Sequence, residues 1–340
     1  MDIFIRKEGQ AGRATLSRPK SLNALTKQMS IDLESALDTW RDDPAVKLII
    51  LDAEGDKAFC AGGDIADLYT QGMKGAFTYG HEFWRQEYRL NLKIANYPKP
   101  IVSFMQGFIM GGGVGVGCHG SHRIVDENSK IAMPECRIGL IPDVGGTYLL
   151  ANAPQGLGVL LGMTGMRMTS TDAIFSGFAD YEISQNKWSD LIPELVETGQ
   201  TESIFPMRNS IQDSPLAKEM ADILHAFEAS SVTGIMAILE AHDTEASKKV
   251  IKGLKSGSPL SLACTLEMIH RAKDMNLAEA LAQEFRFSYR AQEDSDFLEG
   301  IRAQIIDKDF APSWRHKTLD VPQSDVNHML ASLDAAEWAG

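Results

Sequence analysis

The chain has 340 residues and carries 33 Lys and Arg against 46 Asp and Glu, which gives a net charge of −13. Apolar residues make up 44% of the chain, enough to form a packed core, so extended disorder is excluded. The acidic balance argues against a protein that binds nucleic acid through a broad basic face. At about 150 residues per domain, the length predicts two domains or one large domain with an appendage.

The four cysteines are scattered along the chain, and none forms a CxxC pair or a zinc-like spacing. We therefore expect reduced thiols, no metal site and a cytoplasmic location. Residues 1–8 lack an apolar segment, which argues against a targeting peptide. Residues 101–118 are uncharged but include six glycines, which disfavour a helix, so we expect a buried strand and a glycine-rich turn with no membrane partner.

Strand and helix signals alternate over the first 200 residues. In chain order we expect a hairpin over 2–17, helices over 26–41 and 77–95, strands over 46–51, 101–105 and 123–125, and a short helix after residues 111–113. This alternation, with short connections, predicts an α/β core built from repeated strand–helix crossovers.

The pattern changes after about residue 200. Residues 204–215 contain two prolines and several polar residues and are typical of a linker. Helices are then predicted over 216–229, 235–240, 260–274, 278–292 and 296–305. We therefore expect a catalytic core over 1–200 and a helical C-terminal region over 201–340.

Two loops of small residues each follow a strand. Residues 58–65 read Ala-Phe-Cys-Ala-Gly-Gly-Asp-Ile, in which Asp64 suits a helix N-cap and exposed N–H groups suit an oxyanion. A tight turn with a helix cap is the alternative. Residues 111–113 are three glycines, which let a ligand approach the backbone closely. Residues 115–120 fit G-x-G-x-x-G but do not directly follow a strand, so we expect no dinucleotide cofactor.

A third segment holds two carboxylates eight residues apart, Glu135 and Asp143. Pro134 and Pro142 fix the backbone beside them, and Gly139 lets the chain reverse between them. The two carboxylates could therefore converge on one pocket, where neighbouring like charges separate their titrations and suit acid, base or nucleophile roles. Surface acids or helix caps are the alternative.

The order and spacing of these three motifs resemble the crotonase superfamily, the enoyl-CoA hydratase/isomerase fold, and residues 17–25 resemble its opening segment. The resemblance covers nearly the whole chain and implies a spiral of repeated ββα units that binds an acyl-CoA. It also implies that the N–H groups of Gly63 and Gly112 hold the thioester oxygen, and that Ala61, Asp64 and Gly111 contact the substrate. No cofactor is implied, because coenzyme A is part of the substrate.

The acids indicate which branch of the superfamily is closest. Hydratases of this family usually carry a glutamate at the position of Gly115 and a glycine at the position of Asp143. The segment that contains Glu87, together with residues 297–303 and 312–314, instead resembles the 3-hydroxyisobutyryl-CoA hydrolase branch. The resemblance implies hydrolysis of a short-chain 3-hydroxyacyl-CoA, with 3-hydroxyisobutyryl-CoA of valine breakdown as the first expectation.

In this interpretation Glu135 either attacks the thioester carbonyl or activates water, and the sequence leaves both routes open. Asp143 would orient the substrate hydroxyl or relay a proton, and Glu87 would help select the hydroxylated acyl group. An enoyl-CoA hydratase/isomerase and a catalytically silent acyl-CoA-binding protein are the rival hypotheses. Lys20 and Lys57 could meet the coenzyme A phosphates, although each is also typical of a solvated surface. A homo-oligomer is possible in this superfamily.

Cys60, Cys118 and His119 lie beside the glycine loops. No local His or Asp is placed to activate either thiol, so we interpret both cysteines as packing residues. His119 is interpreted in the same way, as a helix-face or core residue.

Overall fold

The computed structural model describes residues 2–210 and 213–340. It divides into two compact units that interleave along the chain. The first consists of Met1–Gly63, Arg89–Ile131 and Met168–Ser214, and the second of Asp64–Tyr88, Ala132–Arg167 and Pro215–Gly340. We predicted one region on each side of a boundary at about residue 200, and that division stays a prediction. The compact units do not follow the linear order of the chain, because each is assembled from three segments.

The first unit is built on a six-stranded sheet with the order β1-β2-β3-β5-β7-β9. Its strands are β1 (Ile3–Glu8), β2 (Ala11–Leu16), β3 (Leu48–Ala53), β5 (Ile101–Met105), β7 (His122–Val125) and β9 (Tyr181–Glu182). The pair β1 and β2 is the predicted hairpin, with Ile3 opposite Leu16, and all later pairs are parallel. The predicted strand–helix crossovers are therefore confirmed in this unit.

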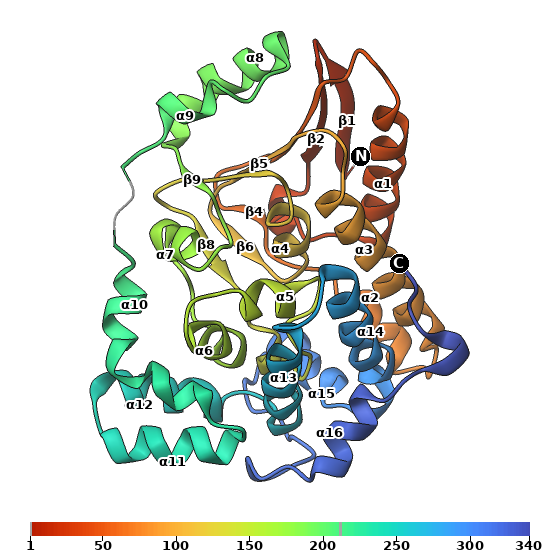
Figure 1. Ribbon diagram of the computed structural model, residues 1–340. Coiled ribbons are helices and arrows are strands. Elements are labelled where there is room, and N and C mark those ends of the chain that lie inside the picture. Colours follow the sequence, from red (N-terminus) through yellow and green to blue (C-terminus); the bar gives the residue numbers. More distant parts are fainter. Residues whose placement is uncertain (1, 211–212) are drawn as a thin grey trace. The chain divides into compact units, whose positions relative to one another are not determined.

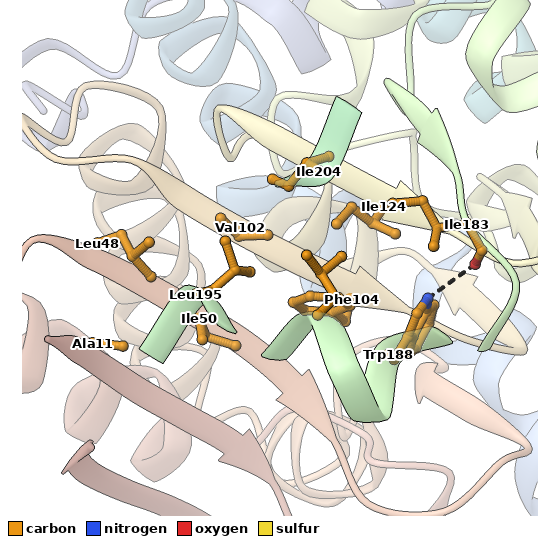
Figure 2. Close-up of a cluster of buried hydrophobic side chains, with 11 residues drawn as sticks. Ala11, Leu48, Ile50, Val102, Phe104, Ile124, Ile183, Trp188, Leu195 and Ile204 are labelled. Carbon is orange, nitrogen blue, oxygen red and sulfur yellow. Dashed lines mark hydrogen bonds between the residues drawn. The ribbon is translucent and has the colours of Figure 1, made fainter. Parts of the chain in front are cut away.

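One face of this sheet is covered by α8 (Trp188–Thr198), as Figure 2 shows. Trp188 packs edge-on against Phe104, and its indole N–H donates a 2.9 Å hydrogen bond to the carbonyl oxygen of Ile183. Burying these aromatic and aliphatic side chains stabilises the unit, because each large side chain removes much apolar surface from water. The sheet is thus a rigid base for the loops at its strand ends.

The remaining helices of the first unit are α1 (Lys27–Arg41), α4 (Gly112–Gly117), α7 (Ser170–Phe175) and α9 (Ile204–Met207), together with the end of α3 (Thr78–Ala95) after Tyr88. The helix predicted for 26–41 is α1, and the side chain of Thr26 caps it by accepting from the N–H of Met29 at 3.1 Å. The predicted linker over 204–215 instead begins with the short helix α9, because Ile204 is buried and joins the apolar cluster of Figure 2.

A second sheet has three short strands in the order β4-β6-β8 (Ala58–Cys60, Phe108–Met110 and Lys130–Ala132). The strands β4 and β6 are parallel, so their carboxyl ends share one edge of the sheet. The uncharged run 101–118 forms β5 and α4, as predicted, and also the strand β6, which was not predicted. No helix among residues 2–210 and 213–340 is long and apolar enough to cross a membrane.

The second unit is almost entirely helical. It contains α2 (Ala66–Gly72), the first part of α3, α5 (Gly146–Ala151), α6 (Leu157–Thr164), α10 (Pro215–Met220), α11 (Val232–His242), α12 (Glu245–Lys255), α13 (Pro259–Ala272), α14 (Leu277–Asp294), α15 (Phe297–Ile301) and α16 (Gln323–Leu330). The helices α11 and α12 form an antiparallel pair (Figure 1). The predicted helical C-terminal region is confirmed, although α12 and α16 were not predicted.

Candidate active site

The two glycine loops lie side by side in the first unit, because each follows one of the paired strands β4 and β6. A Cβ on Gly113 would lie 2.1 Å from the carbonyl oxygen of Cys60, so only glycine permits this approach of the two backbones. Gly62 O accepts a 2.9 Å hydrogen bond from the N–H of Leu25, which ties the first loop to residues 22–25. The structure thus brings the loops of Gly63 and Gly112 together.

The N–H groups of Gly63 and Gly112 are available to a ligand. Within residues 2–210 and 213–340, neither N–H donates a hydrogen bond to a protein acceptor. The neighbouring amides are occupied, since the N–H of Ala61 donates to Leu22 O at 3.0 Å and that of Val114 to Gly111 O at 2.8 Å. Two N–H groups without a protein acceptor, in loops that approach each other, suit the stabilisation of an oxyanion.

One prediction for the first loop is wrong. The N-cap of α2 is Ile65 and makes no side-chain cap, whereas we expected Asp64 there. The chain does not enter the helix until Ala66, so Asp64 lies one residue too early to cap the first turn.

Residues 115–120, which fit the dinucleotide motif, begin within α4 and not at the end of a strand.

The predicted carboxylates Glu87, Glu135 and Asp143 are buried in the second unit, with exposed fractions of 3%, 5% and 4%. Burial, and then the charge of Asp143, raises the pKa of both Glu87 and Glu135 well above the usual range. Within the described residues, one oxygen of Glu87 and one of Glu135 are enclosed without a hydrogen-bond partner. The alternative that these carboxyl groups are surface acids is therefore excluded. Buried carboxyl groups with raised pKa values are typical of functional sites.

Asp143 is held by a tyrosine. The hydroxyl of Tyr88, in α3, donates a 2.9 Å hydrogen bond to Asp143 Oδ2 and also pairs with the hydroxyl of Ser288 at 2.7 Å. Burial raises the pKa of Asp143 to about 7, although the bond from Tyr88 acts in the opposite direction. Asp143 therefore changes charge near neutral pH, where a group that relays a proton is useful.

The backbone that follows Asp143 is in an unfavourable conformation. Val144 has a φ of +56°, a left-handed value that is rare for a β-branched residue. Such residues persist only where their surroundings hold them, and they gather at functional sites. Glu284, a fully buried residue of α14, accepts hydrogen bonds in this turn from the N–H groups of Gly145 at 2.7 Å and Thr147 at 2.9 Å.

Glu135 begins a 3₁₀ turn, Glu135–Ile138, that packs on the C-terminal helices. A Cβ on Gly139 would lie 2.4 Å from the backbone of Asp296, and one on Gly300 would lie 2.2 Å from the backbone of Ile138. Ser295 Oγ also donates to Gly139 O at 3.1 Å. The segment 297–303, which suggested the hydrolase branch, thus supports the turn that carries Glu135.

Lys20 and Lys57 line a single cavity of about 290 Å³ in the first unit, together with Asn23, Glu54 and Asp56. The structure therefore brings these two lysines together.

The cysteines are buried, and burial raises the pKa of Cys118 to about 12, so the expectation of a packing role is confirmed.

Sequence analysis did not identify Tyr88, Glu284 and Ser288. Tyr88 follows Glu87 within an amphipathic helix, where it reads as an ordinary core residue. Glu284 and Ser288 lie about 140 residues after Asp143 in a helix with regular apolar spacing. The one available signal was that two polar residues four apart fall on the apolar face of that helix.

The comparisons with known proteins agree on the family. The enoyl-CoA hydratase/isomerase family matches residues 11–330. A protein of Rattus norvegicus named mitochondrial 3-hydroxyisobutyryl-CoA hydrolase is 37% identical and covers 99% of this chain and 90% of its own. The structure of an enoyl-CoA hydratase from Rhodobacter sphaeroides is 49% identical, with a TM-score of 0.95 and full coverage of both chains. That of a carnitinyl-CoA dehydratase from Mycobacterium thermoresistibile is 38% identical, with a TM-score of 0.94 and coverage of 99% and 98%.

These matches confirm the predicted crotonase-like fold, since two solved structures superimpose over almost the whole chain, helical C-terminal region included. The names of the similar proteins describe different reactions on coenzyme A thioesters, so they establish the family more firmly than the reaction. The chain belongs to the enoyl-CoA hydratase/isomerase family.

Proposed function

We propose that this enzyme hydrolyses the thioester of a short-chain 3-hydroxyacyl-CoA, with 3-hydroxyisobutyryl-CoA, an intermediate of valine degradation, as the expected substrate. The observation that carries the proposal is the buried pair Glu135 and Asp143 in one unit, with Asp143 held by Tyr88. The relatives named 3-hydroxyisobutyryl-CoA hydrolase support it, because they are 35–37% identical over 94–99% of the chain.

Two similar structures bear the names of a hydratase and a dehydratase, and water addition to an enoyl-CoA is the second candidate function. That reaction usually employs a glutamate at the position of Gly115. Gly115 is buried in α4 and offers no acid or base there. Hydrolysis needs only one carboxylate at the carbonyl carbon and a proton relay, which Glu135 and Asp143 supply.

In the proposed reaction, the N–H groups of Gly63 and Gly112 bind the thioester oxygen as it becomes an oxyanion, each donor contributing about 2.7–4 kcal/mol. Glu135 attacks the carbonyl carbon, the carbon–sulfur bond breaks, and the coenzyme A thiolate leaves and takes up a proton. Water then hydrolyses the mixed anhydride and regenerates Glu135. In the alternative route Glu135 removes a proton from water, which attacks directly.

The other predicted residues have supporting roles in this proposal. Ala61, Gly111 and Asp64 contact the acyl-CoA near the glycine loops, and Glu87 binds the 3-hydroxyl group of the acyl chain. The cavity between Lys20 and Lys57 is proposed for the coenzyme A phosphates. The substrate brings its own coenzyme A, so no separate cofactor takes part. A cytoplasmic location and a homo-oligomer stay predictions.

The test is a direct comparison of two products. Purified protein is given 3-hydroxyisobutyryl-CoA and other 3-hydroxyacyl-CoA esters in a thiol-release assay, and crotonyl-CoA in a hydration assay. We expect thiol release, with 3-hydroxyisobutyryl-CoA preferred, and hydration at least about 100-fold slower. Hydration without thiol release would establish the second candidate function, and binding without turnover would establish a silent acyl-CoA-binding protein.

A further inference from the structure

The carboxylate of Glu284 is tied entirely to the turn that follows Asp143. Its Oε2 accepts from the N–H of Gly145 at 2.7 Å, and its Oε1 accepts from the N–H of Thr147 at 2.9 Å and from the Thr147 hydroxyl at 2.5 Å. Both carboxylate oxygens are therefore engaged, and the side chain is fully buried. One residue of the C-terminal region thus satisfies three donors of the Asp143 turn.

The same helix also reaches Asp143 by a second path. Ser288 follows Glu284 by four residues in α14, so both side chains lie on one helical face. The Ser288 hydroxyl pairs with Tyr88, whose hydroxyl donates to Asp143 Oδ2. One turn of α14 therefore fixes the backbone after Asp143 through Glu284 and the carboxyl group of Asp143 through Ser288 and Tyr88.

A carboxylate at this place is costly to bury, and what it provides is hydrogen-bond acceptors for the turn. Glu284 is enclosed near Asp143, and burial raises the pKa of Glu284 to about 8, although the hydrogen bonds from Thr147 and Gly145 act in the opposite direction. The ionised form, which accepts all three bonds, is therefore costly to bury. A buried ionisable group is often replaced by apolar residues without loss of stability. What an apolar residue would not supply is acceptors for three donors, in a turn that contains Val144 at a φ of +56°.

We propose that Glu284 is a positioning residue, which holds the turn 143–147 so that the carboxyl group of Asp143 stays in its reactive orientation. This inference rests on the proposed hydrolysis for its effect on rate, whereas the holding of the turn is independent of which substrate is used. Glu284 acts through the backbone of Gly145 and Thr147 and touches no reacting atom in this assignment. Through Glu284, α14 has a specific role in the reaction in addition to its place in the fold.

The test uses Glu284→Gln in the full chain, with Glu293→Gln as the matched control, because Glu293 lies on the same helix and is exposed. In Glu284→Gln an amide N–H₂ replaces one acceptor oxygen and meets a backbone or hydroxyl donor. Amide hydrogen exchange at Gly145 and Thr147 should become about tenfold faster or more, while exchange in α13 stays unchanged. The value of kcat should fall about 10–100-fold, with KM within about threefold.

A pair of variants at Thr147 guards against misfolding of Glu284→Gln. Thr147→Ser keeps the hydroxyl donor and should retain most of kcat, whereas Thr147→Val removes it and should lower kcat about tenfold. Unchanged exchange at Gly145 and Thr147 in Glu284→Gln would overturn the proposal, and so would faster exchange with an unchanged kcat. If the wild-type protein releases no thiol, the proposed hydrolysis fails, and the exchange measurement still decides whether Glu284 holds the turn.

Discussion

The two units of this enzyme carry different kinds of chemical groups. The first unit presents backbone N–H groups at Gly63 and Gly112, in loops that follow paired parallel strands. The second unit presents the carboxyl groups of Glu87, Glu135 and Asp143 on helices and turns. Backbone donors have no titration near neutral pH, whereas burial raises the pKa of all three carboxyl groups.

This difference decides how each unit tolerates change. The glycine loops depend on close backbone approach, so an added Cβ at Gly113 disrupts them through contact with Cys60. The carboxyl groups depend on burial and on their hydrogen-bond partners, so an isosteric amide removes the charge with little change in shape. The predictions for the glycine loops and the carboxyl groups therefore use a backbone change in the first unit and amide substitutions in the second.

The largest effect is expected for Glu135→Gln. An amide neither attacks the thioester nor removes a proton from water, so thiol release should fall about 1,000-fold or more. A single turnover in ¹⁸O-labelled water then separates the two routes in the wild-type protein. Label in the Glu135 side chain supports the mixed anhydride, with water attacking its Glu135 carbon. Label in the product alone is expected both for direct attack by water and for attack on the substrate carbon of the anhydride, and trapping of the acylated Glu135 by mass spectrometry distinguishes these two. Thiol release that is unchanged in Glu135→Gln would remove this residue from the mechanism.

The next effect concerns a backbone donor, which is removed by proline and kept by alanine. Gly112 is the first residue of α4, where proline is tolerated because that N–H has no partner in the helix. In Gly112→Pro we expect kcat to fall about 100–1,000-fold through loss of one oxyanion donor. Gly112→Ala is the control, since it keeps the N–H group. An equal loss in both variants would mean that space, and not the donor, matters at this position.

A smaller effect follows from the titration of Asp143, whose pKa is raised to about 7 in the folded protein. A raised pKa means that the folded state holds this proton more tightly than the unfolded state. The free energy of unfolding should therefore fall as pH rises from about 4 to 7, and stay low above that. Asp143→Asn removes this loss and should stabilise the protein by about 4 kcal/mol at pH 8, with little change at pH 4, because the pKa is raised from 3.8 to about 7 and each pH unit corresponds to about 1.4 kcal/mol. Urea unfolding at the two pH values measures the difference, and equal stabilisation at both would contradict it.

The sequence predicted β1, β2, β3, β5 and β7 and the helices α1, α3, α13 and α14, because each has a regular apolar pattern or clear end signals. The short strands β4, β6, β8 and β9 were not predicted, since each has only two or three residues. The helix α6 was not predicted, since all eight of its residues are buried and it has no polar face to reveal a helical period. A change of helix type within one segment was also not predicted. Residues 296–305 were predicted as one helix, and the structure changes after Ile301 to a wider π turn, Arg302–Ile306.

The candidate site divides in the same way. Glycine loops and proline-bracketed acids are local patterns, so the two loops, Glu135 and Asp143 were singled out from short motifs, and the family resemblance added Gly63 and Gly112 as the expected oxyanion donors. Tyr88, Glu284 and Ser288 act across long sequence separations, and each resembles a core residue until its partner is known. A single sequence shows no such pairing, because periodicity reports which face of a helix is buried but not what it is buried against.

The smallest expected effect lies at the cavity of Lys20 and Lys57 in the first unit, where the groups are charged side chains at an exposed surface. If they attract coenzyme A phosphates, Lys20→Ala and Lys57→Ala should each raise KM about two- to fivefold, with kcat unchanged. The effect should shrink at 0.5 M salt, because exposed charges are screened. Lys47→Ala, another exposed lysine of the same unit, is the control. A fall in kcat at either lysine would instead place it among the groups that act on the reacting carbonyl, and the division between a backbone oxyanion site and side-chain acids would no longer hold.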